Sequence, residues 1–534
     1  MYIDGPVYAD GIVKGKQTKF TGLNRGAGAG EGEICAMRNL TSDHYPLLAT
    51  RERRRILTTL AKPNGLYAWE KLAWVDGTGF YYDGVLRGTV TDSRKHFAAI
   101  NETILIFPDK KFYDTIEDEF GSLESEAVGL SVVFRDGTIY GEEAEANTIY
   151  CESVDWGDYF REGDAIEITG SSIEANNQTL IIREIDGHEL RFAENSFTNG
   201  SDEAGTISFK RSVPDLDFAF ENENRIWGGK GNVIYASKLG DPFNFEVYDG
   251  VDTDSFTVDT GSRGDFTGGC SYLGYPTFFK EDVLYKVYGS KPSNFEVISG
   301  ARLGLAAGSG LSLAVANEVL LYLNRSGMCM YSGGIPTPVS RAFGTTHYKN
   351  AVAGSDGVKY YVSMQDQDGG QHLFVYDMQR GLWHEEDETE VLAFAELEGV
   401  LYALERSGRI LILRYGTECP ESEEENAFTW CAEFADFTDD SPNKKGLTKM
   451  QIRLELEEGA KCTVYVQTDS SGEWIKPQGG EIEEEIKRSY TLAIIPVRAD
   501  HYRIRLEGTG GCKVYSIARD TYAGSEYRSQ PGRQ

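Results

Sequence analysis

Short runs of apolar and aromatic residues, each closed by Gly, Asp or Asn, recur along almost the whole chain, and helical periodicity is nearly absent. Runs of this length between turn residues are typical of β-strands in sandwiches, barrels and propellers. The 60 Gly against 15 Pro suit many tight turns, because such turns often need a positive φ. The pattern therefore predicts an all-β protein.

A loose unit repeats through much of the chain: an apolar strand, a turn with Asn, Glu or Gly, a second apolar strand, a turn with Ser-Gly or Asp-Gly, and a third apolar strand. One small sheet cannot bury both of its faces alone, whereas several sheets packed around an axis cover one another and limit exposed edges. The candidate units lie at 66–88, 96–115, 222–237, 268–290, 311–333, 351–387 and 391–415. They predict a six- or seven-bladed β-propeller over residues 61–124 and 213–416.

Two further β domains are predicted outside this repeat. Residues 125–212 contain strands that alternate apolar and polar positions, which predicts a small β-barrel or sandwich inserted into a propeller loop. After an acidic linker at 418–426, residues 427–522 predict a C-terminal β-sandwich of the jelly-roll type. We expect residues 1–60 to form an N-terminal arm and the first strands, and residues 523–534 to form a flexible tail.

The charge of the chain excludes one class of partner. Lys and Arg number 53 against 84 Asp and Glu, which gives a formal net charge of −31 in 534 residues. Such a surface repels nucleic acid and anionic membranes at long range, so a protein that grips DNA is not expected. A protein past which DNA slides is still compatible with this charge.

No targeting segment, membrane span or disulfide framework is expected. Residues 1–20 lack a basic start followed by an apolar run, and no stretch of 18 apolar residues occurs. The eight Cys are scattered without a C-x-x-C pair, so we expect reduced cysteines in the core.

The sequence offers no catalytic constellation, and we predict no catalytic, cofactor-binding or metal-binding residues. The P-loop, zincin and nucleophile-elbow motifs are missing, and Gly26–Gly32 lacks the strand and helix of a dinucleotide loop. Two acidic clusters could gather carboxylates for calcium or acid–base chemistry, but we favour a strand entry with Pro for the first and a hairpin turn for the second. They comprise Asp215, Asp217, Glu221 and Glu223, and Asp366 with Asp368.

One basic cluster stands out against the acidic background. Arg51, Arg53, Arg54 and Arg55 lie within five positions, and guanidinium groups bind carboxylates and phosphates bidentately. We take these four as candidates for a contact with the acidic surface of a neighbouring subunit, or, second, for phosphate contacts in a lumen. The alternative is a solvated face with partial ion pairing.

Several phrases resemble a known family. Asn224–Gly228 (NRIWG), Ala236–Pro242 (ASKLGDP) and Arg325–Tyr331 (RSGMCMY) are similar to tailed-bacteriophage proteins of the packaged-DNA stabilisation or tail-nozzle type. The likeness covers roughly residues 15–415. It implies a virion tail component, made in the bacterial host cytoplasm, that forms a homo-oligomeric, sixfold ring. It also implies contacts with portal, adaptor and other tail proteins, and double-stranded DNA that passes through the lumen without specific binding.

Two other functions stay open at this point. A carbohydrate-binding or carbohydrate-cleaving propeller, such as a tail spike, would use aromatic side chains as sugar platforms, although aromatics equally fill blade cores. A cellular propeller scaffold is the third candidate, and the lack of strict WD or kelch repeats argues against it.

Overall fold

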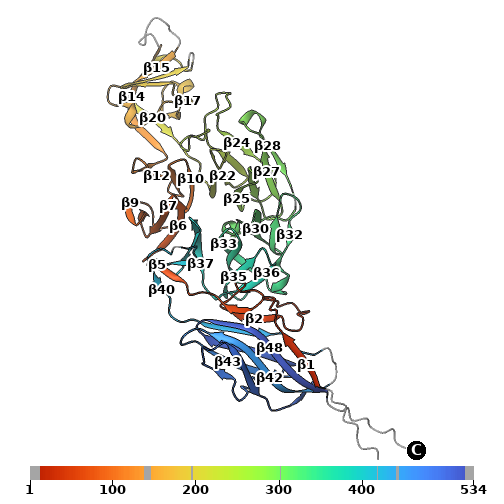
Figure 1. Cartoon of the computed structure of the whole chain (residues 1–534). Helices are drawn as coiled ribbons and strands as arrows, with labels where there is room; N and C mark the ends of the chain where they lie inside the picture. The colour runs from red at the N-terminus through yellow and green to blue at the C-terminus, as the bar shows by residue number, and fades with distance from the viewer. Residues whose placement is uncertain are drawn as a thin grey trace, which may run out of the picture. The chain divides into compact units, whose positions relative to one another are not determined.

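The computed structural model describes residues 12–136, 146–193, 196–300, 302–417, 419–439 and 444–523. The chain forms two compact units, one of residues 61–313 and one of residues 1–60 with 314–534 (Figure 1). Nearly all regular structure is β-strand, so the predicted all-β class is confirmed. The helical segments among these residues are the short 3-10 turns η2 (Trp156–Asp158), η3 (Glu174–Asn176), η4 (Pro292–Asn294), η5 (Gly310–Ser312) and η6 (Ser340–Phe343). No helix in this part of the chain has the length and hydropathy of a membrane span.

Unit 61–313 contains four-stranded antiparallel sheets in which the strands follow chain order. The first sheet comprises β6 (Pro63–Trp69), β7 (Lys71–Asp76), β8 (Gly79–Tyr82) and β9 (Val85–Thr89), and the second β10 (His96–Ile100), β11 (Thr103–Phe107), β12 (Lys111–Asp114) and β13 (Glu119–Ser122). The third comprises β21 (Phe218–Asn222), β22 (Arg225–Lys230), β23 (Val233–Ala236) and β24 (Phe256–Asp259), and the fourth β25 (Gly268–Tyr272), β26 (Tyr275–Phe279), β27 (Leu284–Tyr288) and β28 (Glu296–Ser299). The first strands β6, β10, β21 and β25 contact one another in succession, which is the packing of propeller blades.

Strand β11 explains why apolar runs are continuous in these sheets. All five of its residues are buried, because its sheet is covered on both faces. Ile104 and Ile106 pack with the core of the β6–β9 sheet, whereas Leu105 and Phe107 pack with residues near the third sheet. The strand begins after a tight hairpin turn in which Asn101 adopts a φ of 51°, a conformation that Asn tolerates well.

The segment from Ser125 to Arg211 forms a separate seven-stranded sheet in the order β17-β16-β20-β14-β15-β19-β18. Its strands are β14 (Ser125–Asp136), β15 (Ala146–Tyr150), β16 (Ala165–Thr169), β17 (Thr179–Ile181), β18 (Glu184–Asp186), β19 (Glu189–Ala193) and β20 (Gly200–Arg211). Its own core is built around Trp156 and Phe209, whose rings meet at 4.9 Å. The antiparallel pair β14 and β20 carries the chain out of the propeller-type sheets and back.

Unit 1–60 with 314–534 contains further sheets of the same type. Two of them comprise β29 (Ala314–Ala316), β30 (Val319–Asn324), β31 (Gly327–Tyr331) and β32 (Thr337–Pro338), and β33 (Tyr348–Ser355), β34 (Lys359–Asp366), β35 (Gln371–Asp377) and β36 (Leu382–Glu385). The next comprises β37 (Val391–Leu397), β38 (Val400–Glu405) and β39 (Arg409–Arg414), followed by β5 (Arg55–Thr59) and β40 (Glu423–Glu424). Strand β5 therefore completes, from the N-terminal part of the chain, a sheet whose other main strands lie more than 300 residues later.

The remaining strands of this unit form two antiparallel sheets. One follows β3-β4-β48-β42-β45, with β1 on β48 and β46 on β42, and the other follows β2-β41-β47-β43-β44. The strands are β1 (Ile12–Gln17), β2 (Ile34–Arg38), β3 (Leu40–Thr41), β4 (Leu48–Thr50), β41 (Thr429–Phe434), β42 (Lys445–Leu456), β43 (Lys461–Thr468), β44 (Glu481–Ile482), β45 (Arg488–Ala493), β46 (Arg498–Ala499), β47 (Tyr502–Thr509) and β48 (Cys512–Ala523). The sheets pack together, with the Arg519 guanidinium of the first 4.2 Å from the ring of Phe437, which neighbours the second.

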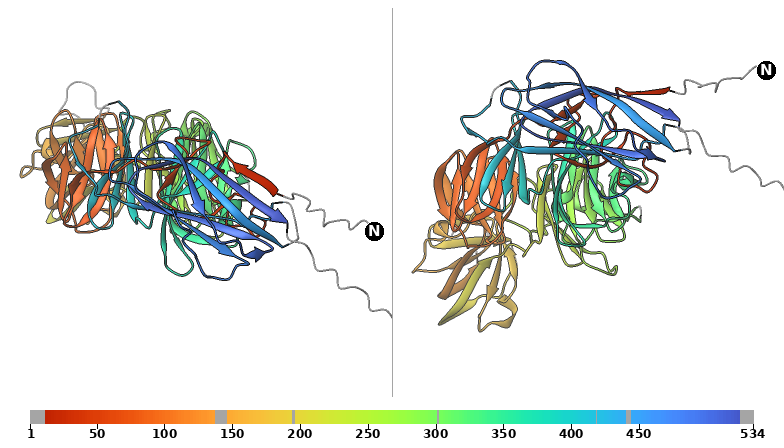
Figure 2. Two further views of the ribbon diagram at one scale, coloured as in Figure 1. Left: turned by 60° about the horizontal axis from the view of Figure 1, so that its bottom comes forward. Right: turned by 90° about the horizontal axis from the view of Figure 1, so that it is seen from below.

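The N-terminal strands pair with strands from the C-terminal part of the chain. Strand β1 pairs with β48, from Ile12 opposite Tyr522 to Gln17 opposite Ile517 (Figure 2). Strand β2 pairs with β41, so residues from both ends of the chain share these sheets. The physical reason is that pairing with an open sheet edge satisfies the backbone N–H and C=O groups that the edge leaves unpaired. The tail predicted at 523–534 lies outside the described residues from 524 onward.

Candidate functional site

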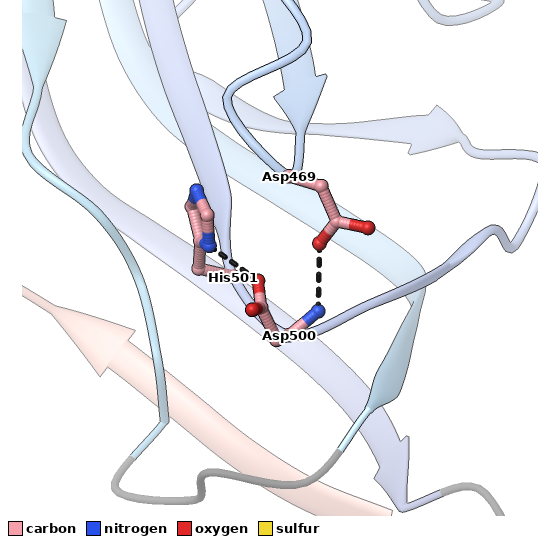
Figure 3. A group of neighbouring side chains, drawn as sticks. All are labelled: Asp469, Asp500 and His501. Carbon is pink, nitrogen blue, oxygen red and sulfur yellow. Dashed lines mark hydrogen bonds and ion pairs between the residues drawn. The ribbon is translucent and has the colours of Figure 1, made fainter.

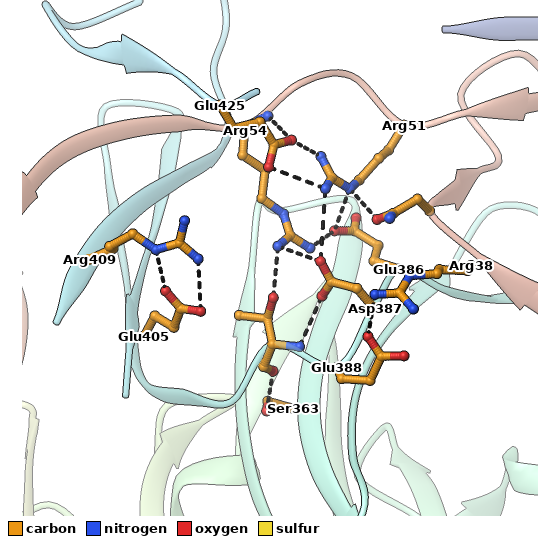
Figure 4. A network of polar contacts seen from close by, with 12 residues as sticks. Arg38, Arg51, Arg54, Ser363, Glu386, Asp387, Glu388, Glu405, Arg409 and Glu425 are labelled. Carbon is orange, nitrogen blue, oxygen red and sulfur yellow. Dashed lines mark hydrogen bonds and ion pairs between the residues drawn. The ribbon is translucent and has the colours of Figure 1, made fainter. Parts of the chain in front are cut away.

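Arg54, one of the four candidate arginines, points into the protein from the segment between β4 and β5. Its residue is only 4% exposed. Its terminal nitrogens donate to Glu386 Oε2 at 2.6 Å and to Thr389 Oγ1 at 2.9 Å, and Nη1 lies 2.9 Å from Asp387 (Figure 4). Because this guanidinium is desolvated and paired with carboxylates of its own subunit, it is not available to a neighbour.

Arg51 lies beside Arg54 and is equally engaged. Its Nε donates to Asn39 Oδ1 at 2.6 Å, its Nη1 pairs with Glu425, and its guanidinium stacks 4.4 Å from the Phe428 ring. Glu425 also accepts from the backbone N–H of Arg54 at 2.7 Å. The acidic linker thus supplies a carboxylate that ties it to both arginines (Figure 4).

The charges of this network, Arg51 and Arg54 with Glu386, Asp387 and Glu425, reinforce one another. Burial raises the pKa of Asp387, but the neighbouring Arg54 guanidinium outweighs burial and lowers it to about 2. Burial lowers the pKa of Arg54, and the carboxylates of Asp387 and Glu386 raise it above its ordinary value. Removing one partner of such a buried set leaves an uncompensated charge, which costs about 3–5 kcal/mol. The network holds the segment between β4 and β5 against the connection between β36 and β37.

The other two candidate arginines remain accessible. Arg53 lies 3.5 Å from Glu424 with 34% of its side chain exposed, and Arg55 donates to the Ser422 hydroxyl and carbonyl oxygens at 2.8 Å. Arg51 and Arg54 are thus buried and paired within the chain, and only Arg53 and Arg55 are accessible for the expected intersubunit or lumen contact. It stays a prediction for Arg53 and Arg55.

A small polar cavity adjoins the network and is closed to any substrate. Its volume of about 20 Å³ holds no more than a water molecule. Asp43 accepts from Lys359 Nζ at 2.8 Å and from Arg414 Nη1 at 3.0 Å on its wall. Burial raises the pKa of Asp43, yet these two cations bring it down to about 2. These ion pairs hold the elements around the cavity together, and its volume leaves no space for a substrate.

A histidine bridges two carboxylates in the same unit. His372 Nδ1 lies 2.6 Å from Glu385 and Nε2 lies 3.0 Å from Asp366. Arg25 pairs with Glu385 and donates to the Tyr348 hydroxyl at 3.0 Å. Burial lowers the pKa of His372, but the hydrogen bonds to the two carboxylates raise it above the ordinary value.

Both acidic clusters considered for calcium are turns and ion pairs. Asp217 accepts from Lys230 at 2.7 Å, and Glu221 caps the backbone N–H of Asn224 at 2.7 Å in a hairpin turn. Asp366 Oδ1 accepts from the backbone N–H groups of Asp368 and Gly370 at 2.9 and 2.7 Å. Neither cluster converges its oxygens on an empty centre.

A different group, which sequence reasoning missed, brings possible cation ligands together. Asp469, after β43, and Asp500 and His501, before β47, offer ligand atoms within 4.8 Å of one another (Figure 3). The Asp469 carboxylate accepts from the Asp500 backbone N–H at 2.8 Å, and His501 Nε2 lies 2.7 Å from the Ser470 hydroxyl. Both carboxylates are exposed, and these bonds account for the cluster without an ion.

Unit 61–313 holds the larger cavity, of about 260 Å³. It lies between the β10–β13 hairpin turns, the segment just before β16 of the inserted sheet and the loop around Phe243. Its carboxylates are Glu102, Asp114, Glu119, Glu162, Asp164 and Asp241. Arg161 stacks 4.6 Å from the Phe243 ring, and buried Asp164 pairs with Arg211 and accepts from Asn244 Nδ2 at 2.9 Å. The cavity is thus acidic, with one stacked cation on its wall.

All eight cysteines are free, and Cys151, Cys329, Cys462 and Cys512 are buried. Their burial agrees with the expectation of reduced core residues. It gives no sign of a disulfide framework in the described structure.

Comparisons with known proteins add similarity of architecture and nothing finer. No protein-family model and no curated protein matches the chain. Among solved structures, BamB from Moraxella catarrhalis is similar with a TM-score of 0.35 and 10% identity over 70% of this chain and 99% of that chain. U3-55K has a TM-score of 0.32 and 8% identity over 67% and 98%. The phage phi92 endosialidase has a TM-score of 0.17 and 7% identity over 94% and 75%. At these scores the propeller-type sheets rest on the strand topology itself.

Proposed function

We propose that this chain is a structural virion protein of a tailed bacteriophage. In this proposal it forms a ring of the tail-nozzle or DNA-stabilisation type, which extends the DNA channel below the portal and adaptor and helps to retain and deliver the genome. The role is structural rather than catalytic. Its place is the tail of the virion, after synthesis in the bacterial cytoplasm.

The observation that carries the proposal is the set of family-like phrases, because their residues are structural anchors. Arg225 of the NRIWG phrase is buried and donates to the carbonyls of Ser237 and Asp252 at 2.8 and 2.9 Å. Ser237, in the ASKLGDP phrase, accepts from the Ile226 N–H at 3.0 Å. These hydrogen bonds therefore hold the two family-like segments together in one sheet, so both segments serve the fold.

The third phrase is a hairpin in the other unit. It joins β30 to β31, where Gly327 takes a φ of 131° opposite Asn324 and Met328 is fully buried. We further propose that the propeller-type sheets are blades of a six- or seven-bladed propeller, in which β5 completes the sheet of β37, β38 and β39, and that the terminal sheets form a jelly-roll sandwich.

The acidic charge supports a channel wall through which DNA moves. Neutralised phosphates release counterions and hold a duplex in place, whereas a wall of net charge −31 per subunit leaves it mobile. The partners in this proposal are other copies of the chain, in a ring that the family likeness makes sixfold, together with portal, adaptor and other tail proteins.

Electron microscopy tests the proposal directly. The purified chain should form closed rings whose central channel admits a B-form duplex, and an antibody to the chain should label the tails of the virions that carry it. A protein that stays monomeric at high concentration and is missing from tails would contradict it.

The second candidate is a carbohydrate-binding or carbohydrate-cleaving propeller, and the acidic cavity in unit 61–313 favours it. Carboxylates and a stacked guanidinium, such as Arg161 on Phe243, are suited to sugar hydroxyls. Binding on a glycan array that is lost in Arg161→Ala, or depolymerisation of a host surface polymer, would favour this function over the ring.

A further inference from the structure

One sheet of the C-terminal pair has an open face on which side chains can be assigned from strand register. In β42 the even positions Met450 and Ile452 are buried, while Lys449 and Arg453 are exposed. In the strand register Lys449 lies opposite Asp520 of β48, and Asp520 in turn lies opposite Lys14 of β1. Directly paired residues share a face, so these strands present one continuous outer surface.

This outer surface is basic. Lys14 and Lys16 of β1, Lys449 and Arg453 of β42, and Lys487 before β45 are exposed, and Lys513 of β48 is half-buried. The Lys487 ammonium lies 3.9 Å from the ring of Tyr515, which places it on the same face. We call these residues the basic face: Lys14, Lys16, Lys449, Arg453, Lys487 and Lys513.

The cations of the basic face have no acidic partners within the described part of the subunit. None of the six forms an ion pair there, in contrast to the many paired Lys and Arg elsewhere. The face holds two carboxylates, Asp520 opposite Lys449 and Glu455 opposite Lys513, and Glu455 accepts from the Tyr515 hydroxyl at 2.6 Å. A chain of net charge −31 thus gathers unpaired positive charge on one sheet.

We propose that the basic face docks onto the acidic surface of a second copy of this chain. The inference rests on the proposed ring and names the surface that assembles it. Contact is heterologous, because a basic face on one copy meets carboxylates on the next, and a heterologous contact forms a ring when the rotation between successive copies closes. At physiological salt the Debye length is about 8 Å, so the long-range repulsion between acidic copies is screened while these close pairs form.

A second copy fits the face better than a nucleic-acid duplex does. Duplex recognition inserts a helix or a two-stranded ribbon into a groove, and a broad flat sheet reaches phosphates only. The rest of the chain repels phosphate, whereas every further copy brings additional carboxylates with which the cations of the basic face can pair. Charge complementarity therefore favours a second copy of the chain as the partner of the basic face.

The test compares two charge-reversal variants of the full chain. The pair Lys449→Glu and Arg453→Glu removes the centre of the basic face while leaving the buried side of β42 unchanged. The matched control is Lys71→Glu with Lys349→Glu, two exposed strand positions outside this sheet with the same change in net charge. Circular dichroism and thermal melting confirm that each variant folds, and mass photometry at several salt concentrations measures assembly.

The proposal expects the basic-face variant to need about tenfold or more protein to assemble, and the wild type to dissociate as salt rises, with the control assembling normally. Carbodiimide cross-linking of mixed isotope-labelled copies should join Lys449 or Lys513 to a carboxylate of the other copy. Normal assembly of the basic-face variant would overturn the inference and leave the ring function intact, whereas a monomeric wild type would overturn both. Unchanged assembly with salt-sensitive binding of a labelled duplex, lost in the same variant, would assign the face to nucleic acid instead.

Discussion

Two groups of cations in the same unit behave in opposite ways. Arg51 and Arg54 are buried at the start of β5, and each is paired with carboxylates from distant parts of the chain. Lys449 and Arg453 stand on an open sheet face without an ion pair in the described structure. All four are positively charged residues next to β-structure, yet one pair holds the subunit together and the other is free to bind.

The difference shows what burial demands of a charge. A guanidinium taken out of water must find carboxylates, because an unpaired buried charge costs several kcal/mol. A cation on an exposed face stays hydrated and needs no partner, and most exposed pairs add little stability. Charge clusters in a sequence are therefore ambiguous until burial is known.

The largest expected loss of stability comes from removing one cation of the buried ion-pair network. Arg54→Met should destabilise the chain by about 3–5 kcal/mol, because Glu386 and Asp387 would be left buried without their cation. The Arg53 side chain is 34% exposed and lies 3.5 Å from Glu424, so Arg53→Met should lower the free energy of unfolding by less than about 1 kcal/mol. Urea denaturation followed by fluorescence measures both, and equal losses would contradict the distinction.

The second largest loss of stability should come from acid, which protonates Asp387 in the same ion-pair network. The pKa of Asp387 in the folded chain is about 2, below the ordinary 3.8, so its contribution is present at neutral pH and is lost as pH falls through the folded value. The size is roughly 2 kcal/mol. Denaturation curves at decreasing pH should show this loss, and Asp387→Asn should be less stable at neutral pH with a flatter acid dependence.

His372 should produce a smaller effect of opposite sign. Its folded pKa is raised by the carboxylates of Glu385 and Asp366, so its contribution is complete below the unfolded pKa and disappears as pH rises through the folded value. The melting temperature should therefore fall slightly as the pH rises above 6.5, the ordinary pKa of histidine. His372→Gln should remove that slope, and a slope that persists would assign it to other groups.

The smallest effect on stability belongs to the basic face. Lys449→Ala and Arg453→Ala should each change the free energy of unfolding by less than about 0.5 kcal/mol, because both side chains are exposed and neither has an ion-pair partner among the described residues. Equilibrium denaturation of the dissociated chain checks this. A loss comparable to that of Arg54→Met would mean that the face is part of the fold.

Much of the architecture was predictable because strands and turns are local. Continuous apolar runs such as Thr103–Phe107 indicated strands covered on both faces, and Asn101 indicated a tight turn. The alternation along Lys445–Leu456 indicated a strand with one open face. The repeat at 391–415 lacked a fourth strand, however, and nothing local pointed to Arg55–Thr59 as its completion.

The candidate site was less predictable for the same reason. The run of arginines was visible, but their carboxylates lie more than 300 residues away, so burial of Arg51 and Arg54 could not be foreseen. The basic face was equally hidden, since Lys14, Lys449 and Lys513 meet only when β1 and β42 pair with β48.

By itself the sequence determined the all-β class, the propeller-type repeat and the acidic balance, because composition, periodicity and turn chemistry are properties of neighbouring residues. Only the tertiary structure decided which strands share a sheet, that both ends of the chain meet in one pair of sheets, and which cations are buried. Those outcomes depend on long-range pairing, and in this chain such pairing turned the arginine cluster into a lock and left the scattered lysines as an open surface.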